Sequence, residues 1–286
     1  MRIILTGGGT GGHYNRINAV SEKLNELAKQ NRLLRPELFY MSTDPYDEGL
    51  LFENNITFYK VSAGKIRRNK TPENLVKNFF DLFNTFFGSL SALWRDFVIY
   101  PDDVYGKGGY ASFPVLLAAK LLRIPVIIHE SDSKPGKVNT WAGKFARKIA
   151  ISYPEAASYF KKGITAYTGN PIRKAIEEIQ VSGSHEFFGL DKNIPTVLVI
   201  GGSLGSKFIN EAVMDSLGEL VERFQVIHQT GKSHYSIMQE TARVVLNGNK
   251  NKDRYKAFPY MNDLTLRMAS GASDIIVSRA GSAIFE

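Results

Sequence analysis

The chain has 286 residues, 43% of them hydrophobic, and its 36 Lys and Arg against 28 Asp and Glu give a net charge of +8. This length suggests about two domains with a substantial core, which excludes a disordered tail, a fibrous repeat and a disulfide-stapled miniprotein. Because the chain contains no cysteine, disulfides, thiolate metal sites and a cysteine nucleophile are excluded as well. The basic excess favours a nucleic acid, a phosphorylated ligand or an anionic membrane surface as partner, although a generally basic soluble surface would have the same composition.

Short β-branched runs alternate along the chain with longer helical patterns. Met1 to Thr6 read as a strand and not as a signal peptide, and no uncharged apolar run reaches the roughly 18 residues of a membrane span. The alternation predicts an α/β fold with parallel sheets covered by helices. The predicted strands are 2–6, 37–41, 125–129, 148–152, 196–200, 224–228 and 274–278, and the predicted helices are 15–30, 72–95, 112–123, 137–147 and 206–223.

The segment Gly169-Asn-Pro-Ile172 breaks regular structure and predicts a domain boundary. We therefore expect two domains, covering residues 1–170 and 171–286. Strand 274–278 leads only into the start of a further turn and helix, where the sequence stops. On this pattern we expect the second domain to be truncated at its C-terminal end.

Two glycine-rich turns follow predicted strands. Gly7 to Gly12 have the spacing G-x-G-x-x-G, and Gly201 to Ser206 occupy the same position in the second domain. Glycine lets the backbone approach a phosphate, whose charge the following helix N-terminus stabilises, although a tight turn without a ligand has the same pattern. A nicotinamide dinucleotide site would need an acidic residue about 20 residues further on, and the candidate at the second strand, Asp44, lies beyond that. The paired turns predict two Rossmann-like, doubly wound domains facing across a cleft.

Ionisable residues also fall at the carboxyl ends of predicted strands. His13 closes the first turn, where an imidazole can act as a general base near neutral pH, and a histidine that only bonds the helix start is the alternative. Glu130 and Asp132 follow strand 125–129, and a third glycine-rich turn spans Gly106 to Ser112. Ligands bind at this edge of a parallel sheet, although solvated loop acids would look the same. No two histidines have the spacing of a metal site, so no metal is expected.

A basic cluster at Lys65, Arg67 and Arg68 precedes the helix predicted over 72–95. The apolar residues of this helix fall in a sector of about 160°, wider than the roughly 100° that a core-facing helix needs. Within this sector the aromatic residues include Phe79, Phe83, Phe86 and Phe87. The combination indicates contact with an anionic membrane surface, and a deeply buried helix is the alternative.

Several motifs occur together in the order and at the spacings of one family. They are Gly8-Gly-Thr-Gly-Gly-His13, Gly108-Gly-Tyr-Ala-Ser112, Ile124-Pro-Val-Ile-Ile-His-Glu130, Thr168-Gly-Asn-Pro-Ile-Arg173, Gly201-Gly-Ser-Leu-Gly205 with Asn210-Glu-Ala, and Ser278-Arg-Ala-Gly-Ser282. Over essentially its whole length, the chain resembles the bacterial N-acetylglucosaminyltransferases of peptidoglycan synthesis, in glycosyltransferase family 28. The resemblance implies a GT-B fold and an inverting, metal-independent transfer of N-acetylglucosamine from UDP-N-acetylglucosamine (UDP-GlcNAc) to lipid I, which forms lipid II. It implies peripheral binding to the anionic cytoplasmic face of the bacterial cell membrane, with no cofactor and no nucleic acid partner.

The resemblance also implies roles for individual residues. His13 matches the family's proposed base, Glu130 is a second candidate for the catalytic machinery, and Tyr110 matches a cleft position. The other matched positions are Thr10, Gly11 and Gly12 for a phosphate, Arg173, Ser203, Leu204 and Gly205 for the donor, Tyr260 and Met261 for the uracil, and Gly281, Ser282 and Glu286 for the diphosphate and ribose.

The chain departs from the family's pattern at three places. Tyr14 to Asn18 replace a small apolar stretch with proline, and Asp132 replaces an amide, so that its role beside a diphosphate is open. The family also continues past Glu286 with a donor-sugar segment. Two alternatives remain at this point, a membrane-surface binding homologue without transferase activity and an NAD-dependent oxidoreductase that uses the first glycine turn.

Overall fold

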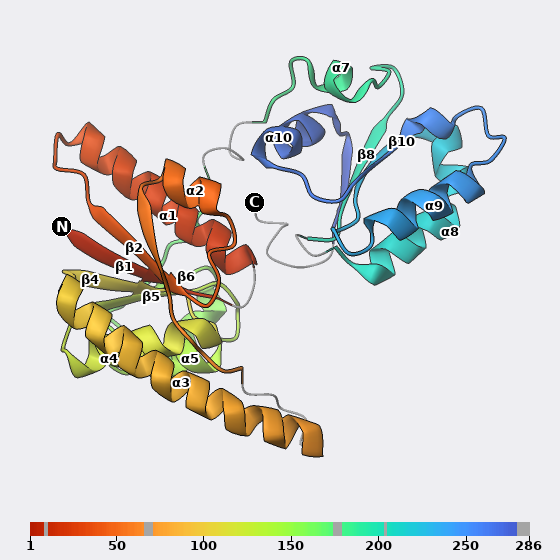
Figure 1. Ribbon diagram of the computed structural model, residues 1–286. Coiled ribbons are helices and arrows are strands. Elements are labelled where there is room, and N and C mark those ends of the chain that lie inside the picture. The colour runs from red at the N-terminus through yellow and green to blue at the C-terminus, as the bar shows by residue number, and fades with distance from the viewer. Residues whose placement is uncertain (9–10, 66–70, 174–178, 203–204, 279–286) are drawn as a thin grey trace. The chain divides into compact units, whose positions relative to one another are not determined.

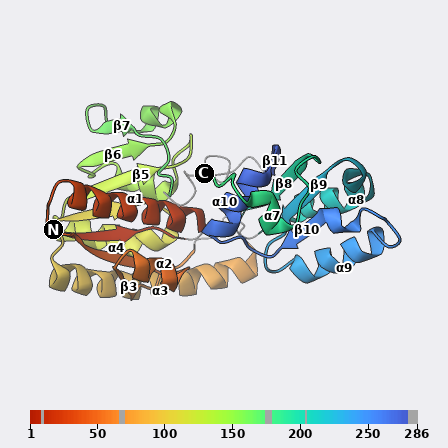
Figure 2. The same ribbon diagram turned by 90° about the horizontal axis from the view of Figure 1, so that it is seen from above.

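Parallel strands organise the whole chain, as the alternating pattern predicts. The computed structural model describes residues 1–8, 11–65, 71–173, 179–202 and 205–278. The chain divides into Met1–Arg173, here called unit 1, and Lys174–Glu286, here called unit 2. Each unit has a parallel sheet with helices on both faces (Figures 1 and 2), which confirms the predicted fold class of two Rossmann-like domains.

Unit 1 contains a seven-stranded sheet in the order β3-β2-β1-β4-β5-β6-β7. The order runs outward in both directions from β1 and β4, so the switch point of this doubly wound sheet lies between these two strands. Its strands are β1 (Arg2–Thr6), β2 (Glu37–Ser42), β3 (Ile56–Lys60), β4 (Asp103–Gly106), β5 (Val126–Glu130), β6 (Lys148–Ile151) and β7 (Thr165–Tyr167). Its helices are α1 (Gly11–Gln30), α2 (Glu48–Glu53), α3 (Pro72–Ile99), α4 (Phe113–Leu121) and α5 (Lys137–Ala142), with 3₁₀ helices at Tyr110–Ser112 and Pro154–Tyr159.

Unit 2 contains a four-stranded parallel sheet in the order β10-β9-β8-β11. Its strands are β8 (Thr196–Ile200), β9 (Gln225–Gln229), β10 (Tyr255–Phe258) and β11 (Ile275–Ser278). Its helices are α7 (Ser184–Phe188), α8 (Lys207–Arg223), α9 (Tyr235–Val245) and α10 (Asp263–Ala272), with a 3₁₀ helix at Lys252–Arg254. Helices α8 and α9 cover one face of this sheet and α7 and α10 the other (Figure 1).

Burial on both faces explains why the central strands are nearly all apolar. Successive side chains of a strand point to opposite faces. In β1, Ile4 packs into the core under α3 and α4. Its neighbours Ile3 and Leu5 pack on the other face with Tyr14 and Ile17 of α1. A strand enclosed in this way has no polar side, which is why its sequence reads as a continuous apolar run.

Some elements differ from the sequence prediction. The predicted helix over 137–147 is wrong beyond Ala142, where α5 ends at Gly143 and the chain turns toward β6. The strand pattern also misses β3, β4, β7 and β10. Short length and a polar start hide β4, which has only four residues and begins with Asp103.

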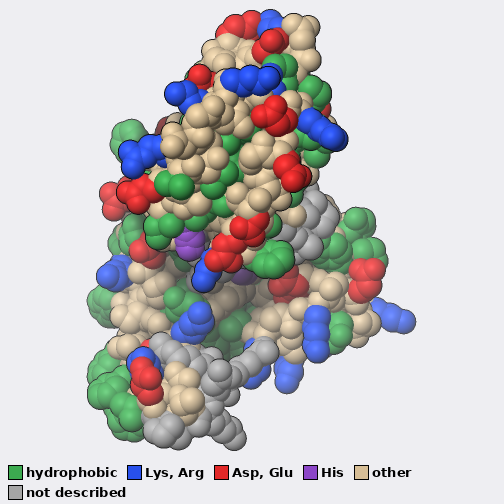
Figure 3. Space-filling model, turned by 90° about the vertical axis from the view of Figure 1, so that its right-hand side faces the viewer, with side chains coloured by type: hydrophobic (Ala, Val, Ile, Leu, Met, Phe, Trp, Pro, Cys, Tyr) green, Lys and Arg blue, Asp and Glu red, His purple; other side chains and the backbone are tan. Residues whose placement is uncertain are grey.

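Helix α3 leaves much of its apolar surface uncovered. Its N-cap is Thr71, whose side chain accepts a hydrogen bond from the backbone N–H of Asn74. Gly88 and Ala92 face the interior, and α3 packs along α4. The exposed apolar side chains of α3 are those of Val76, Phe79, Phe80, Leu82, Phe83, Phe86, Phe87, Leu90, Trp94, Phe97 and Val98. Figure 3 shows hydrophobic side chains gathered on the lower part of unit 1.

Because these side chains are exposed, the alternative of a deeply buried helix is wrong for α3. Lys65, from the basic cluster, is also exposed, while Arg67 and Arg68 lie outside the described residues. Within the described part of the chain, no helix is long and apolar enough to cross a membrane.

Candidate active site

The two glycine turns of unit 1 meet at the switch point of its sheet. Thr6 of β1 pairs with Gly106 of β4, so both strands end side by side. A Cβ atom added at Gly8 would lie 2.5 Å from the Cβ atom of Ala111, and one added at Gly109 would lie 2.1 Å from the carbonyl oxygen of Gly8. The turns therefore touch backbone to backbone, and glycine is required for that approach.

His13 is the third residue of α1 and faces this junction. Its ring is half-buried, and its Nδ1 atom is buried with no hydrogen-bond partner among the described residues. Burial, followed by the nearby charges of Lys107 and Arg16, lowers the pKa of His13 to about 4, although Asp132 acts in the opposite direction. The imidazole is therefore neutral at pH 7, with a pKa below the range near neutrality in which a general base is most effective.

Lys107, which no sequence pattern indicates as a site residue, is fully buried beside His13. Its amine contacts Nδ1 of His129, and the opposite ring nitrogen of His129, Nε2, lies 2.9 Å from the carbonyl oxygen of Gly169. Burial and the charge of Arg16 lower the pKa of Lys107 to about 6. A lysine between glycines reads in sequence as a solvated turn residue, and only the adjacency of β4 and β5 reveals its neighbours.

Glu130 ends β5 and organises the loop that follows. Its carboxylate accepts hydrogen bonds from the backbone N–H groups of Asp132 and Gly136, at 2.9 and 3.1 Å, and from the side-chain amide of Asn139 at 3.0 Å. Asp132 itself is exposed. Its carboxylate therefore avoids the cost of burying an unpaired charge. The negative charge of Asp132 raises the pKa of Lys107 and so favours the protonated amine.

Four further predicted residues belong to unit 1. Tyr110 opens the 3₁₀ helix Tyr110–Ser112 and is half-buried. Arg173 is buried and is the last residue of the unit. Gly11 and Gly12 open α1.

In unit 2, the second glycine turn lies against the segment that follows β9. A Cβ atom added at Gly205 would lie 2.0 Å from the carbonyl oxygen of Thr230. Gln229 bridges this region, because its side chain donates a hydrogen bond to the carbonyl of Gly202, at 3.1 Å, and accepts one from the backbone N–H of Met261, at 2.9 Å. The structure thus connects the predicted phosphate turn to the predicted uracil-reading residue through an amide that the sequence analysis does not single out.

Tyr260 and Met261, at one end of this bridge, differ in their exposure. Tyr260 is exposed, and the Lys232 amine lies 5.9 Å from the centre of its ring. Met261 is buried. The predicted positions Thr10, Ser203, Leu204, Gly281, Ser282 and Glu286 lie outside the described residues.

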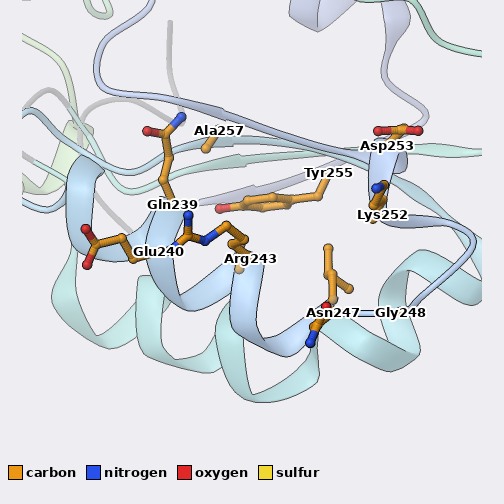
Figure 4. Close-up of a pocket in the computed structure, with 11 residues that line it drawn as sticks. Gln239, Glu240, Arg243, Asn247, Gly248, Lys252, Asp253, Tyr255 and Ala257 are labelled. Atoms are coloured by element: carbon orange, nitrogen blue, oxygen red, sulfur yellow. The ribbon is translucent and has the colours of Figure 1, made fainter.

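Unit 2 also has a hollow of about 540 Å³ between α9 and β10. Figure 4 shows Tyr255 reaching from β10 toward Gln239 and Arg243 of α9. None of the predicted site residues lines this hollow, and its mixed charged lining gives no clear ligand chemistry. Among the described residues, no group of three or more histidines and acids is arranged to hold a metal ion.

The fold and the glycine turns define a class of α/β proteins that bind phosphate-bearing ligands at the carboxyl ends of parallel strands. The model of the glycosyltransferase family 28 N-terminal domain matches residues 3–151, and the model of its C-terminal domain matches residues 196–286. The chain belongs to glycosyltransferase family 28.

Its relatives include a UDP-N-acetylglucosamine--N-acetylmuramyl-(pentapeptide) pyrophosphoryl-undecaprenol N-acetylglucosamine transferase of Clostridium tetani, which is 34% identical over all of this chain and 74% of that protein. A transferase of the same name from Clostridium novyi is 35% identical, again over all of this chain and 74% of the relative.

Solved structures share the fold. MurG of Acinetobacter baumannii has a TM-score of 0.62 at 24% identity, over 99% of this chain and 73% of that one. A UDP-GlcNAc 2-epimerase from Neisseria meningitidis, bound to UDP-GlcNAc, has a TM-score of 0.65 at 14% identity, over 99% and 78% of the two chains. At these identities the likeness concerns the fold alone.

Proposed function

We propose that the chain transfers N-acetylglucosamine from UDP-GlcNAc to lipid I and so forms lipid II for peptidoglycan. The observation that carries the proposal is the similarity of the entire chain, at 34% identity, to a transferase named for this donor and acceptor. The placement of a neutral histidine at the switch point of unit 1 supports it.

In the proposed reaction, the C4 hydroxyl of the N-acetylmuramyl group attacks the anomeric carbon of the donor sugar. His13 takes the hydroxyl proton as the new C–O bond forms, and the bond between the anomeric carbon and the UDP oxygen breaks. Attack opposite the leaving group inverts the anomeric configuration. A base with a pKa of about 4 stays unprotonated at neutral pH but is weak, so we expect the negative charge of the bound substrates to raise this pKa in the complex.

UDP leaves with additional negative charge, which the backbone can stabilise. We place the diphosphate at the turn Gly201 to Gly205 and at the start of α8, because the first N–H groups of a helix lack partners within the helix and the helix dipole favours an anion there. Met261 and Tyr260 would receive the uracil. The donor roles of Arg173, Ser203, Leu204, Gly281, Ser282 and Glu286, and the phosphate role of Thr10, Gly11 and Gly12, stay proposals from the family resemblance.

The acceptor carries a polyprenyl chain, so the reaction takes place at a membrane surface. We assign α3 and Lys65 to this contact, with Arg67 and Arg68 as further cationic candidates. The exposed aromatic side chains of α3 would enter the headgroup region while the lysine and arginines meet anionic lipid. The enzyme would thus bind peripherally, at the cytoplasmic face where both substrates are available.

The test is transfer of labelled N-acetylglucosamine to lipid I in vesicles at saturating UDP-GlcNAc. We expect lipid II to form, and we expect His13→Ala to lower kcat at least a hundredfold. The matched control is His185→Ala on α7, which should leave turnover unchanged. If the wild type binds vesicles and UDP but forms no lipid II, the binding homologue replaces this proposal. Binding of NADH in place of UDP would instead favour the oxidoreductase.

A further inference from the structure

Lys107 is a buried amine for which the proposed transfer provides no role. It follows β4 directly, its backbone N–H donates to the carbonyl of Thr6 at 2.8 Å, and its side chain is 0% exposed. Burying a lysine costs free energy unless its surroundings compensate. The amine contacts Nδ1 of His129, and the negative charges of Glu130 and Asp132 also stabilise its protonated form.

The hydrogen bonds of His129 define the direction of this contact. Nε2 lies 2.9 Å from the carbonyl oxygen of Gly169, an acceptor only, so Nε2 carries the hydrogen. In a neutral imidazole Nδ1 is then the acceptor, and the amine of Lys107 is the donor. The ring of His129 is thereby held from both ends, between the turn that follows β4 and the segment that ends unit 1.

Charged and titratable groups surround Lys107 on every packed element. Arg16 and His13 approach from α1, Glu130 from β5, and Asp132 from the following loop. The charge of protonated Lys107 lowers the pKa of His13 and so opposes protonation of that ring.

We propose that Lys107 is a positioning residue that fixes the ring of His129 by a hydrogen bond and, when protonated, opposes protonation of the ring of His13. The catalytic consequence rests on the proposed function, in which His13 is the base. The structural consequence does not, because the ring states of both histidines exist without substrate.

The test combines two variants with a matched control. Lys107→Met removes both the donor and the charge, while Lys107→Gln keeps an N–H donor without the charge. Lys137→Met removes an exposed lysine of α5 and serves as the control. Because the chain has only five histidines, ¹⁵N-labelled imidazoles can be assigned and titrated individually.

Because the Gly169 carbonyl still holds the hydrogen on Nε2, we expect Lys107→Met to change only the other nitrogen: the ¹⁵N resonance of Nδ1 of His129 should move to that of an acceptor without a donor. In Lys107→Gln and the control it should stay near its wild-type position. In both Lys107 variants the titration midpoint of His13 should rise by about one pH unit, and the acid limb of kcat/KM should move with it. An unchanged His13 midpoint in both variants, or an unchanged Nδ1 resonance of His129 in Lys107→Met, overturns the proposal. If Lys107→Met does not fold, the His13 midpoint in Lys107→Gln decides. A wild type that forms no lipid II refutes the proposed function while leaving the titration interpretable.

Discussion

Gly109 lies directly against the carbonyl oxygen of Gly8, and this contact joins the two glycine turns of unit 1. A Cβ atom at Gly109 would come within 2.1 Å of that oxygen, and its φ of +81° is in the left-handed region. Gly109→Ala should therefore separate the turns that carry His13 and Lys107. We expect a loss of more than about 3 kcal/mol in the free energy of unfolding, measured by urea denaturation, because steric overlap adds to backbone strain.

Gly163 provides a matched control for the backbone strain alone. Its φ is +85°, and an added Cβ atom would meet no other atom within 4 Å. Gly163→Ala should cost only about 1–2 kcal/mol. Equal losses in the two variants would show that the contact between the turns contributes nothing beyond dihedral strain.

The sequence predicts the sheets well where both faces are buried. The apolar runs of β1 and β8 identify these strands, since an enclosed parallel strand has no polar side. The pattern fails for β4, which begins with Asp103 and has only four residues. Its neighbours in the sheet, and not its composition, make it a central strand.

Only part of the candidate site can be predicted from the sequence. Glycine spacing identifies the first turn and places His13 beside it, because a strand–turn–helix junction has a local signature. Lys107 and Gln229 have no such signature. Their partners, His129 for the lysine and Met261 for the glutamine, are 22 and 32 residues away in the chain, so only the folded sheet brings them together.

Asp96 should make the free energy of unfolding decrease as the pH rises, whereas an ion-paired acid makes it increase. It is fully buried on α3, neither carboxylate oxygen has a hydrogen-bond partner among the described residues, and desolvation raises its pKa to about 8. The folded state then holds a proton that the unfolded state loses above its ordinary pKa near 4. Stability is therefore lost as pH rises from about 4 to about 8, with a total effect on the order of 5 kcal/mol.

Asp96→Asn removes this titration and should flatten the pH dependence. We expect the variant to match the wild type near pH 5 and to be more stable at pH 8, as measured by urea denaturation across this range. The exposed Asp215 of α8 gives the matched control, since Asp215→Asn should leave the slope unchanged. A wild-type stability that is constant from pH 5 to pH 8 would contradict the prediction.

The exposed aromatic face of α3 should determine binding to lipid. Phe83 and Phe87 lie one turn apart and are 48% and 61% exposed. Replacing both by serine removes apolar area that would otherwise enter the membrane interface, so affinity for phosphatidylglycerol vesicles should fall at least tenfold in co-sedimentation. Because these side chains are exposed, the free energy of unfolding should change little.

Phe208 on α8 is 80% exposed and provides the matched control for the loss of a surface aromatic residue. Phe208→Ser should leave vesicle binding unchanged. Equal binding by the α3 double variant and the wild type would remove α3 as the membrane contact.

Gln229 should control the donor side of unit 2 through its two hydrogen bonds. Its amide donates to the carbonyl of Gly202 and accepts from the N–H of Met261. Gln229→Glu replaces the donor with a carboxylate oxygen that faces the Gly202 carbonyl, so two acceptors oppose each other and the turn must shift. We expect the Kd for UDP, measured by calorimetry, to rise by roughly tenfold or more.

The control is Gln225→Glu, since Gln225 is equally buried but donates to the carbonyls of Asp191 and Ile194 at the opposite end of β9. That variant should lose stability while its folded fraction binds UDP normally, and weakened UDP binding in both variants alike would show that the effect comes from general destabilisation and not from the bridge.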